Sequence, residues 1–230
     1  VPGFGEVFDA GQAVAAHDFL GLPKDELILT VIELNETAEL ALGTEQGVVK
    51  RVVADYPAKD EFEIISLKDG DRVVGAALAT DASTLVFVSS DAQLLHYSAS
   101  SVRPQGRPAG GVAGINLDEA AKVIFFTAVS SAENAVVVTA ANSSLSIPGT
   151  DAGSLKISDL SEFPGKGRAT GGVRSQRFVR GEDQLYFAWV GDEPIKALTA
   201  DGKPIELRGE KAKRDASGTP QPAVVGSVGN

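Results

Sequence analysis

The chain has 230 residues, of which 43% are hydrophobic and 23% charged, and it carries a net charge of -10 without a single cysteine. Disulfides and thiolate metal sites are therefore excluded, and no apolar run reaches the ~20 residues that a membrane-spanning helix needs. The charge also argues against unspecific binding of polyanions by the whole surface. We expect a cytoplasmic protein without membrane contact. The opening residues 1–5 lack both an initiator methionine and the order of a signal peptide, which predicts an excised fragment.

Short apolar, β-branched runs bounded by turn residues follow one another along the chain. No long window keeps a 3.6-residue period strongly enough to outweigh them, although Gly11 to Leu20 could form a helical turn or two. The sequence therefore predicts a nearly all-β fold. The expected strands are Leu27–Glu33, Glu39–Leu42, Val48–Val53, Arg72–Ala79, Thr84–Val88, Leu94–Tyr97, Val123–Val129, Ala135–Thr139, Ser154–Ile157, Gln184–Val190 and Ile195–Thr199.

A four-residue pattern that is typical of hairpin turns follows several of these strands. Its copies are Thr44–Gly47, Ser89–Ala92, Thr139–Asn142 and Thr199–Gly202. Gly or Asn in the fourth place suits the positive φ that a tight turn often requires, and Ala92 is the departure. The copies recur every ~45 to 60 residues, a spacing typical of propeller blades or solenoid coils. We therefore expect small sheets repeated in a ring or an arc.

After Arg208 the chain becomes rich in Lys, Ser, Pro and Gly, with no apolar run before Ala223 to Val225. This composition predicts a flexible C-terminal tail over residues 209–230, in which Val224 and Val225 could anchor on a neighbouring sheet.

One phrase occurs twice, as Gly106–Val112 (GRPAGGV) and Gly167–Val173 (GRATGGV), and both copies lie in stretches without acidic residues. An arginine beside glycines can offer a guanidinium and backbone N–H groups to the same phosphate. We therefore predict phosphate contacts at the basic residues of these stretches, with Lys50 and Arg51 as second choices. The primary candidates are Arg103, Arg107, Lys166, Arg168, Arg174, Arg177 and Arg180. No aromatic ladder accompanies them, which favours duplex over single-stranded nucleic acid.

Other chemistry finds little support in the residues. His17 and His96 are the only histidines, and no nucleophile motif accompanies them. We expect no catalytic residue, no metal site and no cofactor in this fragment.

Three stretches carry a resemblance to a known family. Thr44–Arg51 (TEQGVVKR) is similar to a strand pair that ends in basic residues, Leu67–Ala76 fits a recurrent L-x-x-G-D-x-V-V-G, and Ser101–Ile115 fits V-R-x-x-G-R-x-x-x-G-V-x-G-I, with a weaker copy at Phe163–Phe178. The chain resembles the C-terminal domain of the A subunit of bacterial type IIA DNA topoisomerases, the family of DNA gyrase and topoisomerase IV.

This resemblance implies a propeller-like β-pinwheel of about five strand-exchanging blades over residues 1–208, with 1–38 as an incomplete first blade. It implies a noncatalytic domain that binds and bends or positions duplex DNA, as part of an ATP-dependent enzyme on the bacterial chromosome. The implied partners are duplex DNA, the remainder of the A subunit, and the ATPase subunit. The family's DNA-cleaving tyrosine lies in its N-terminal region, so Tyr56, Tyr97 and Tyr186 do not take that role.

The gyrase box, of the form Q-R-R-G-G-K-G, is not found in this chain, and Phe163–Ala169 comes nearest but differs in spacing. The resemblance therefore favours a topoisomerase IV-like or divergent A subunit, which positions DNA without wrapping it fully. The alternative is a protein-interaction propeller whose acidic surface binds a basic partner or another region of its own enzyme.

Overall fold

The computed structural model describes residues 16–23, 25–33, 39–147 and 149–230, and the chain divides into two compact units, Val1–Val31 and Ile32–Asn230. In the first unit, helix α1 (Ala16–Leu20) matches the end of the expected helix, whose residues 11–15 lie outside the described part. The strand predicted over residues 27–33 is wrong, since these residues pair with no strand. The expected first blade thus has no strand among its described residues. None of the described helices is long and apolar enough to cross a membrane.

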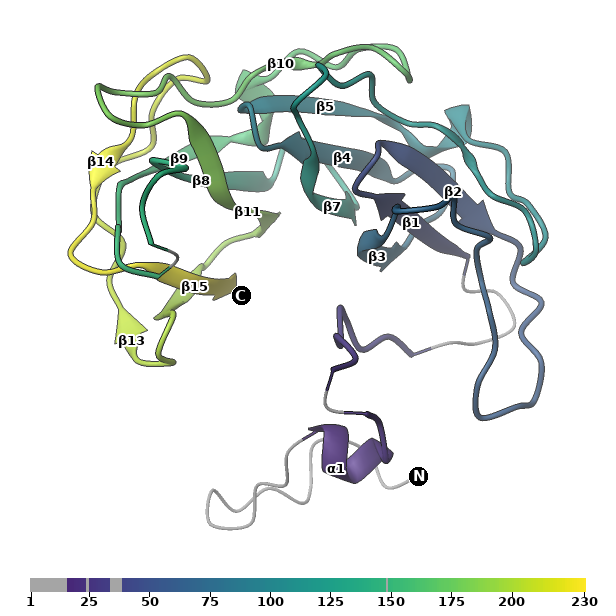
Figure 1. Cartoon of the computed structure of the whole chain (residues 1–230). Helices are drawn as coiled ribbons and strands as arrows, with labels where there is room; N and C mark the ends of the chain where they lie inside the picture. The colour runs from purple at the N-terminus through teal and green to yellow at the C-terminus, as the bar shows by residue number, and fades with distance from the viewer. Residues whose placement is uncertain (1–15, 24, 34–38, 148) are drawn as a thin grey trace. The chain divides into compact units, whose positions relative to one another are not determined.

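In the described part of the second unit, the strands form four small antiparallel sheets (Figure 1). Sheet 1 comprises β1 (Leu40–Thr44), β2 (Val48–Val52), β3 (Val73–Leu78) and β6 (Val112–Ala113). Sheet 2 comprises β4 (Thr84–Ser89), β5 (Gln93–Ser98), β7 (Val123–Val129) and β10 (Val173–Arg174). Sheet 3 comprises β8 (Ala135–Asn142), β9 (Ser154–Asp159), β11 (Gln184–Asp192) and β14 (Thr219–Pro220). Sheet 4 comprises β12 (Lys196–Thr199), β13 (Pro204–Ile205) and β15 (Val225–Gly229).

Neighbouring sheets exchange strands in a regular way. The chain forms a central hairpin and one edge strand of a sheet, continues into the hairpin of the next sheet, and only then returns to complete the first. In this manner β6 pairs with β2, β10 with β5, and β14 with β9. The predicted all-β pinwheel with strand exchange is confirmed, with four sheets in the described residues against the expected five or so blades.

The segment predicted as a flexible tail takes part in two of the sheets. β14 completes sheet 3, and β15 pairs with β12 from Lys196↔Gly229 to Thr199↔Val225, with a register shift between Leu198 and Thr199. Val225 is buried in the cluster between sheets 3 and 4. Residues 219–229 therefore belong to the folded unit, and the anchoring expected of Val225 is confirmed.

The hairpin turns follow the predicted pattern in three of its four copies. The hydroxyl groups of Thr44, Ser89 and Thr199 accept hydrogen bonds from the backbone N–H four residues on, at 3.1, 3.1 and 3.0 Å. The fourth place has positive φ in these three copies, even at Ala92 (62°). The copy at Thr139–Asn142 is wrong as a turn, because β8 continues to Asn142 and a longer connection reaches β9.

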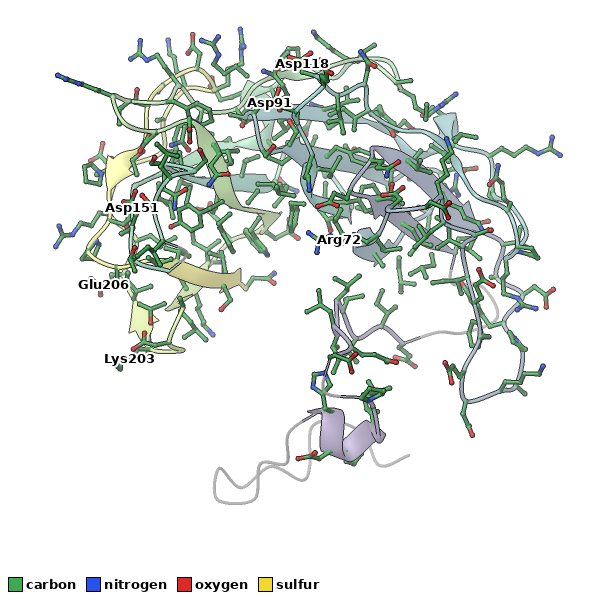
Figure 2. The ribbon with its side chains drawn as sticks, in the orientation of Figure 1. Arg72, Asp91, Asp118, Asp151, Lys203 and Glu206 are labelled. Atoms are coloured by element: carbon green, nitrogen blue, oxygen red, sulfur yellow. The ribbon has the colours of Figure 1, made fainter. Side chains whose placement is uncertain are left out.

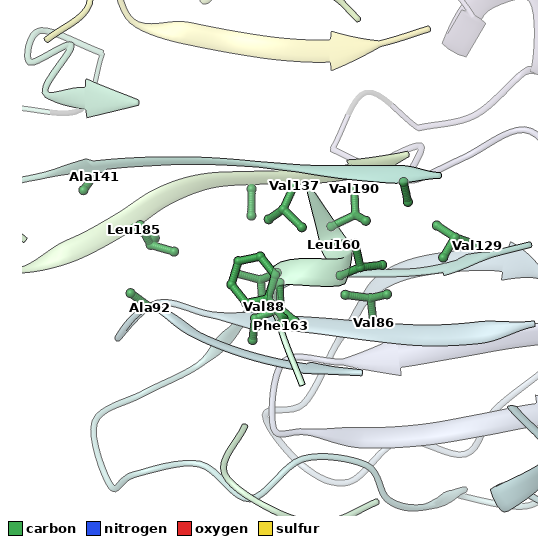
Figure 3. Close-up of a cluster of buried hydrophobic side chains, with 13 residues drawn as sticks. Val86, Val88, Ala92, Val129, Val137, Ala141, Leu160, Phe163, Leu185 and Val190 are labelled. Carbon is green, nitrogen blue, oxygen red and sulfur yellow. The ribbon is translucent and has the colours of Figure 1, made fainter. Parts of the chain in front are cut away.

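The core lies between successive sheets. Between sheets 2 and 3, Val86 and Val88 face Val137 and Val190, and Leu160 and Phe163 fill the space between them (Figure 3). Leu160 begins η2 (Leu160–Glu162), a 3-10 turn that follows β9, and Ala99 of η1 (Ala99–Ser101) follows β5 in the same way.

Candidate nucleic-acid interface

Two loops that precede the short fourth strands carry the repeated phrase. The first rim loop, residues 103–111, enters β6, and the second rim loop, residues 164–172, enters β10. The two strands pair at equivalent positions, Val112↔Val49 and Val173↔Leu94. The two copies of the phrase therefore occupy the same place in successive sheets.

The last glycine of each phrase is required by the backbone. Gly111 and Gly172 have φ of 81° and 76°. A Cβ at these positions would lie 2.6 Å from the carbonyl oxygen of Val49 and 2.5 Å from that of Leu94. Each rim loop therefore passes directly against its sheet, which a larger residue would prevent.

Hydrogen bonds join the second rim loop to the residues that follow β6. The N–H of Ala169 donates to the carbonyl of Gly114 at 2.8 Å, and the N–H of Asn116 donates to that of Thr170 at 3.0 Å. The guanidinium of Arg168 donates to the carbonyl of Ala113. The two acid-free stretches predicted to carry the phosphate contacts thus meet along one edge of sheets 1 and 2.

The basic side chains of the two acid-free stretches keep donors available. Six of them are exposed and Arg107 is half-buried, and within the described ranges none of the seven forms an ion pair with a carboxylate. Arg107 lies 5.8 Å from the ring centre of Phe62, and the amine of Lys166 donates to the carbonyl of Gly172 at 2.9 Å. Figure 2 shows nitrogen-tipped side chains projecting from the edge that carries β10. The residues in question are Arg103, Arg107, Lys166, Arg168, Arg174, Arg177 and Arg180.

Two carboxylates lie beside Lys166 on this edge. Asp91 and Asp118 lie near each other (Figure 2) and line a polar hollow of about 360 Å³ together with Lys166. The edge is therefore not uniformly cationic. In the described part of the chain, no three His, Asp or Glu side chains gather closely enough to hold a metal ion.

The prediction of phosphate contacts at Lys50 and Arg51 is wrong, because both side chains are buried. The Lys50 amine donates to the carbonyls of Ile64, Arg107 and Ala109 at 2.7, 2.6 and 2.7 Å, and desolvation lowers its pKa while nearby Glu63 opposes this. Lys50 thus holds the first rim loop from beneath.

Arg51 is 2% exposed and acts inside the fold. Its guanidinium donates to Glu39 and, at 2.6 Å, to Asp81. It also donates to the carbonyls of Ala99 and Val102 at 2.9 and 3.2 Å, and thereby fixes the turn that follows β5.

A second buried lysine was not found from the sequence. Lys156 is 3% exposed, and its amine donates to Ser158 Oγ and to the carbonyls of Lys213 and Arg214 at 2.8, 3.0 and 2.8 Å. Burial lowers its pKa to about 8 from the ordinary 10.5, with Asp215 and Glu162 opposing the shift. Lys156 occupies the place in β9 that Lys50 occupies in β2, and this repetition is the signal that could have identified it.

Lys156→Met is expected to change how stability depends on pH. Between about pH 8 and 10.5 the unfolded chain keeps a proton that folded Lys156 has released, so this residue makes stability rise with pH. Below pH 8 Lys156 is protonated in both the folded and the unfolded state. Burying its charged amine then lowers the free energy of unfolding by an amount on the order of 1–3 kcal/mol. Urea unfolding across this window should show a steeper rise in the wild type than in the variant. Equal slopes would contradict the assignment, since all other titrating groups are common to both.

Comparisons with known proteins agree with the arrangement of sheets. The family model described as "DNA gyrase C-terminal domain, beta-propeller" matches residues 63–80, 83–130 and 149–185, which include the first rim loop and Lys156. The A subunit of DNA gyrase from Mycolicibacterium smegmatis is 26% identical over 214 residues, which cover 89% of this chain and 24% of that protein. The chain thus spans about a quarter of the length of this relative.

Two solved structures share the fold. The crystal structure of the C-terminal domain of DNA topoisomerase IV superimposes with a TM-score of 0.75 at 21% identity, over 92% of this chain and 68% of that one. The structure of the DNA gyrase A C-terminal domain gives 0.72 at 22% identity, over 92% and 72%. The predicted family resemblance is confirmed by the sequence and structural matches together.

Proposed function

Because this chain is related in sequence and fold to the C-terminal domain of the DNA gyrase A subunit, we propose that it binds duplex DNA along the edge formed by the rim loops. The observation that carries the proposal is that hydrogen bonds join two acid-free, arginine-bearing stretches across neighbouring sheets, from the second rim loop to the residues of and after β6. In a whole type IIA topoisomerase, such a domain would position a DNA segment for strand passage. It would act together with the remainder of the A subunit and with the ATPase subunit.

Phosphate contacts suit the chemistry of this edge. A guanidinium presents a planar fork of N–H donors to phosphate oxygens, and Arg168 uses its hydrogen bond to Ala113 to fix its position while other N–H groups remain. Binding of this kind reads the backbone and the ease of bending rather than the base edges. The body of the domain is acidic, so we expect an affinity that depends on local contacts and falls steeply with salt.

The test is a fluorescence anisotropy titration with labelled duplex DNA at about 50 and 200 mM salt. Changing both Arg107 and Arg168 to Glu is expected to weaken binding by about 10-fold or more, and to lower the salt slope by about 2 as two phosphate contacts are lost.

The matched control changes Lys196 and Lys203 to Glu, which alters the net charge equally on sheet 4, where both side chains are exposed. This control should leave the salt slope unchanged. Absence of wild-type binding at low salt, or equal effects of the two double variants, would reject the proposal and favour binding of a basic protein by the acidic surface.

A further inference from the structure

A third copy of the arginine-bearing segment lies in the part of the chain predicted as a tail. Residues 206–219 align without a gap with residues 99–112 and 160–173, all 14 residues long. The alignment places Arg214 with Arg107 and Arg168, and Gly218 with the two glycines that close the phrase. Few residues are identical between the third copy and the first two. Their equivalence therefore depends on the backbone pairing and hydrogen bonds in the structure.

The backbone pairing is the same in all three copies. Thr219 of β14 pairs with Leu155, two residues after Gly153, as Val112 pairs with Val49 two residues after Gly47. One hydrogen bond recurs at the same place, from the N–H of Gln105, Lys166 and Ala212 to the carbonyls of Arg51, His96 and Ile157, at 2.8, 3.2 and 2.8 Å. Residues 210–218 therefore form a third rim loop, on sheet 3.

The third rim loop continues the edge formed by the first two. The N–H of Arg177 donates to the carbonyl of Ala216 at 3.0 Å, which repeats the bond from Asn116 to Thr170 in the same aligned positions. Arg177 Nε also donates to Ser217 Oγ at 3.2 Å. The residues that follow β10 are thus joined to the third rim loop as the residues of and after β6 are joined to the second.

The loop is also held from beneath by a buried lysine. Lys156 binds the carbonyls of Lys213 and Arg214, as Lys50 binds those of Arg107 and Ala109. In the described ranges neither Lys213 nor Arg214 forms an ion pair with a carboxylate. Lys213 is exposed, and Arg214 is half-buried, as Arg107 is.

We propose that the third rim loop, through Lys213 and Arg214, is a further phosphate-contact site that extends the DNA path onto sheet 3; this rests on the proposed function. Asp215 stands where the other copies have Pro108 and Ala169, and its negative charge makes this contact weaker than the first two.

The experiment compares Arg214→Glu with Arg208→Glu in the anisotropy titration, with the wild type and the Arg107 and Arg168 double variant measured beside them. Arg208 is exposed, lies in the same segment outside the third rim loop, and its replacement changes the net charge equally. We expect Arg214→Glu to weaken binding by about 3- to 10-fold and to lower the salt slope by about 1, while Arg208→Glu leaves the slope unchanged. Hydroxyl-radical footprinting should show a shorter protected stretch for Arg214→Glu.

Asp215→Ala keeps the test sharp if Arg214→Glu fails to fold, because removal of the carboxylate should strengthen binding at low salt. If the double variant weakens binding but Arg214→Glu behaves like Arg208→Glu, or Asp215→Ala has no effect, the third site is rejected while the proposed function stands. If the wild type does not bind duplex DNA, both are rejected.

Discussion

Gly75→Ala is expected to destabilise the domain by about 3 kcal/mol or more. A Cβ at Gly75 would lie 2.1 Å from the carbonyl oxygen of Phe126, which is backbone and cannot turn away. Relief would require β3 and β7 to separate, and with them sheets 1 and 2.

The local structure explains why two glycines meet here. Gly75 of β3 pairs with Gly43 of β1, and a Cβ at Gly43 would lie 2.2 Å from Cγ of the Phe126 ring. The facing pair makes room for one aromatic residue of the next sheet, and Phe126 is only 2% exposed there. The cost of glycine in a strand is offset by the burial of this ring.

Thermal and urea unfolding measure the effect of Gly75→Ala. Gly229→Ala is the matched control, since Gly229 also lies in a strand and a Cβ there meets no atom within 4 Å. The control should change stability little. A Gly75→Ala protein as stable as the control would show that the two sheets pack less closely than described.

Lys50→Met is expected to cost about 3 kcal/mol and to weaken DNA binding at the same time. The variant leaves the carbonyls of Ile64, Arg107 and Ala109 without their shared donor, and each buried unpaired carbonyl costs about 1–3 kcal/mol, less any contribution recovered from water. The first rim loop loses the contact that fixes its bend, so Arg107 is no longer held in place for the phosphate contact that we propose.

Unfolding in urea and the anisotropy titration, at a temperature where the variant stays folded, measure the two effects. Lys203→Met removes the same charge from an exposed side chain and should change neither quantity by much. A variant that loses stability but binds DNA with unchanged affinity and salt slope would show that Lys50 does not contribute to DNA binding.

Local sequence patterns predicted the fold more completely than they predicted the residues of the interface. The hairpins were predictable because each is built from neighbouring residues, with a hydroxyl group at the start of the turn and positive φ at its end. The turn predicted at Thr139–Asn142 failed because the longer β8 absorbs it.

The errors at Lys50 and Arg51 have a nonlocal cause. Basic side chains are common on edge strands, where they face solvent, but β2 lies between β1 and β6. Only the fold brings the carbonyls of Arg107 and Ala109 over Lys50. The prediction of a flexible tail over residues 209–230 failed for a similar reason. β14 is only two residues long and adds little to the core. The composition of residues 209–230 therefore resembles that of an unstructured segment. The strand that pairs with β14 is β9, which lies more than 60 residues earlier in the chain, so the pairing leaves no local signal.

The fourth strand of each of sheets 1 to 3 follows the hairpin of the next sheet in the chain, and this connection links neighbouring sheets mechanically. In a solenoid, every repeat is complete in itself and meets only its neighbours, so stability is close to a sum over units. Here sheet 1 is finished by residues that follow the hairpin of sheet 2, and sheet 2 by residues that follow the hairpin of sheet 3. A tension applied to one arginine-bearing loop is therefore transmitted to two sheets at once, and a load spread along the edge is shared by the whole interlocked assembly instead of peeling it apart one layer at a time.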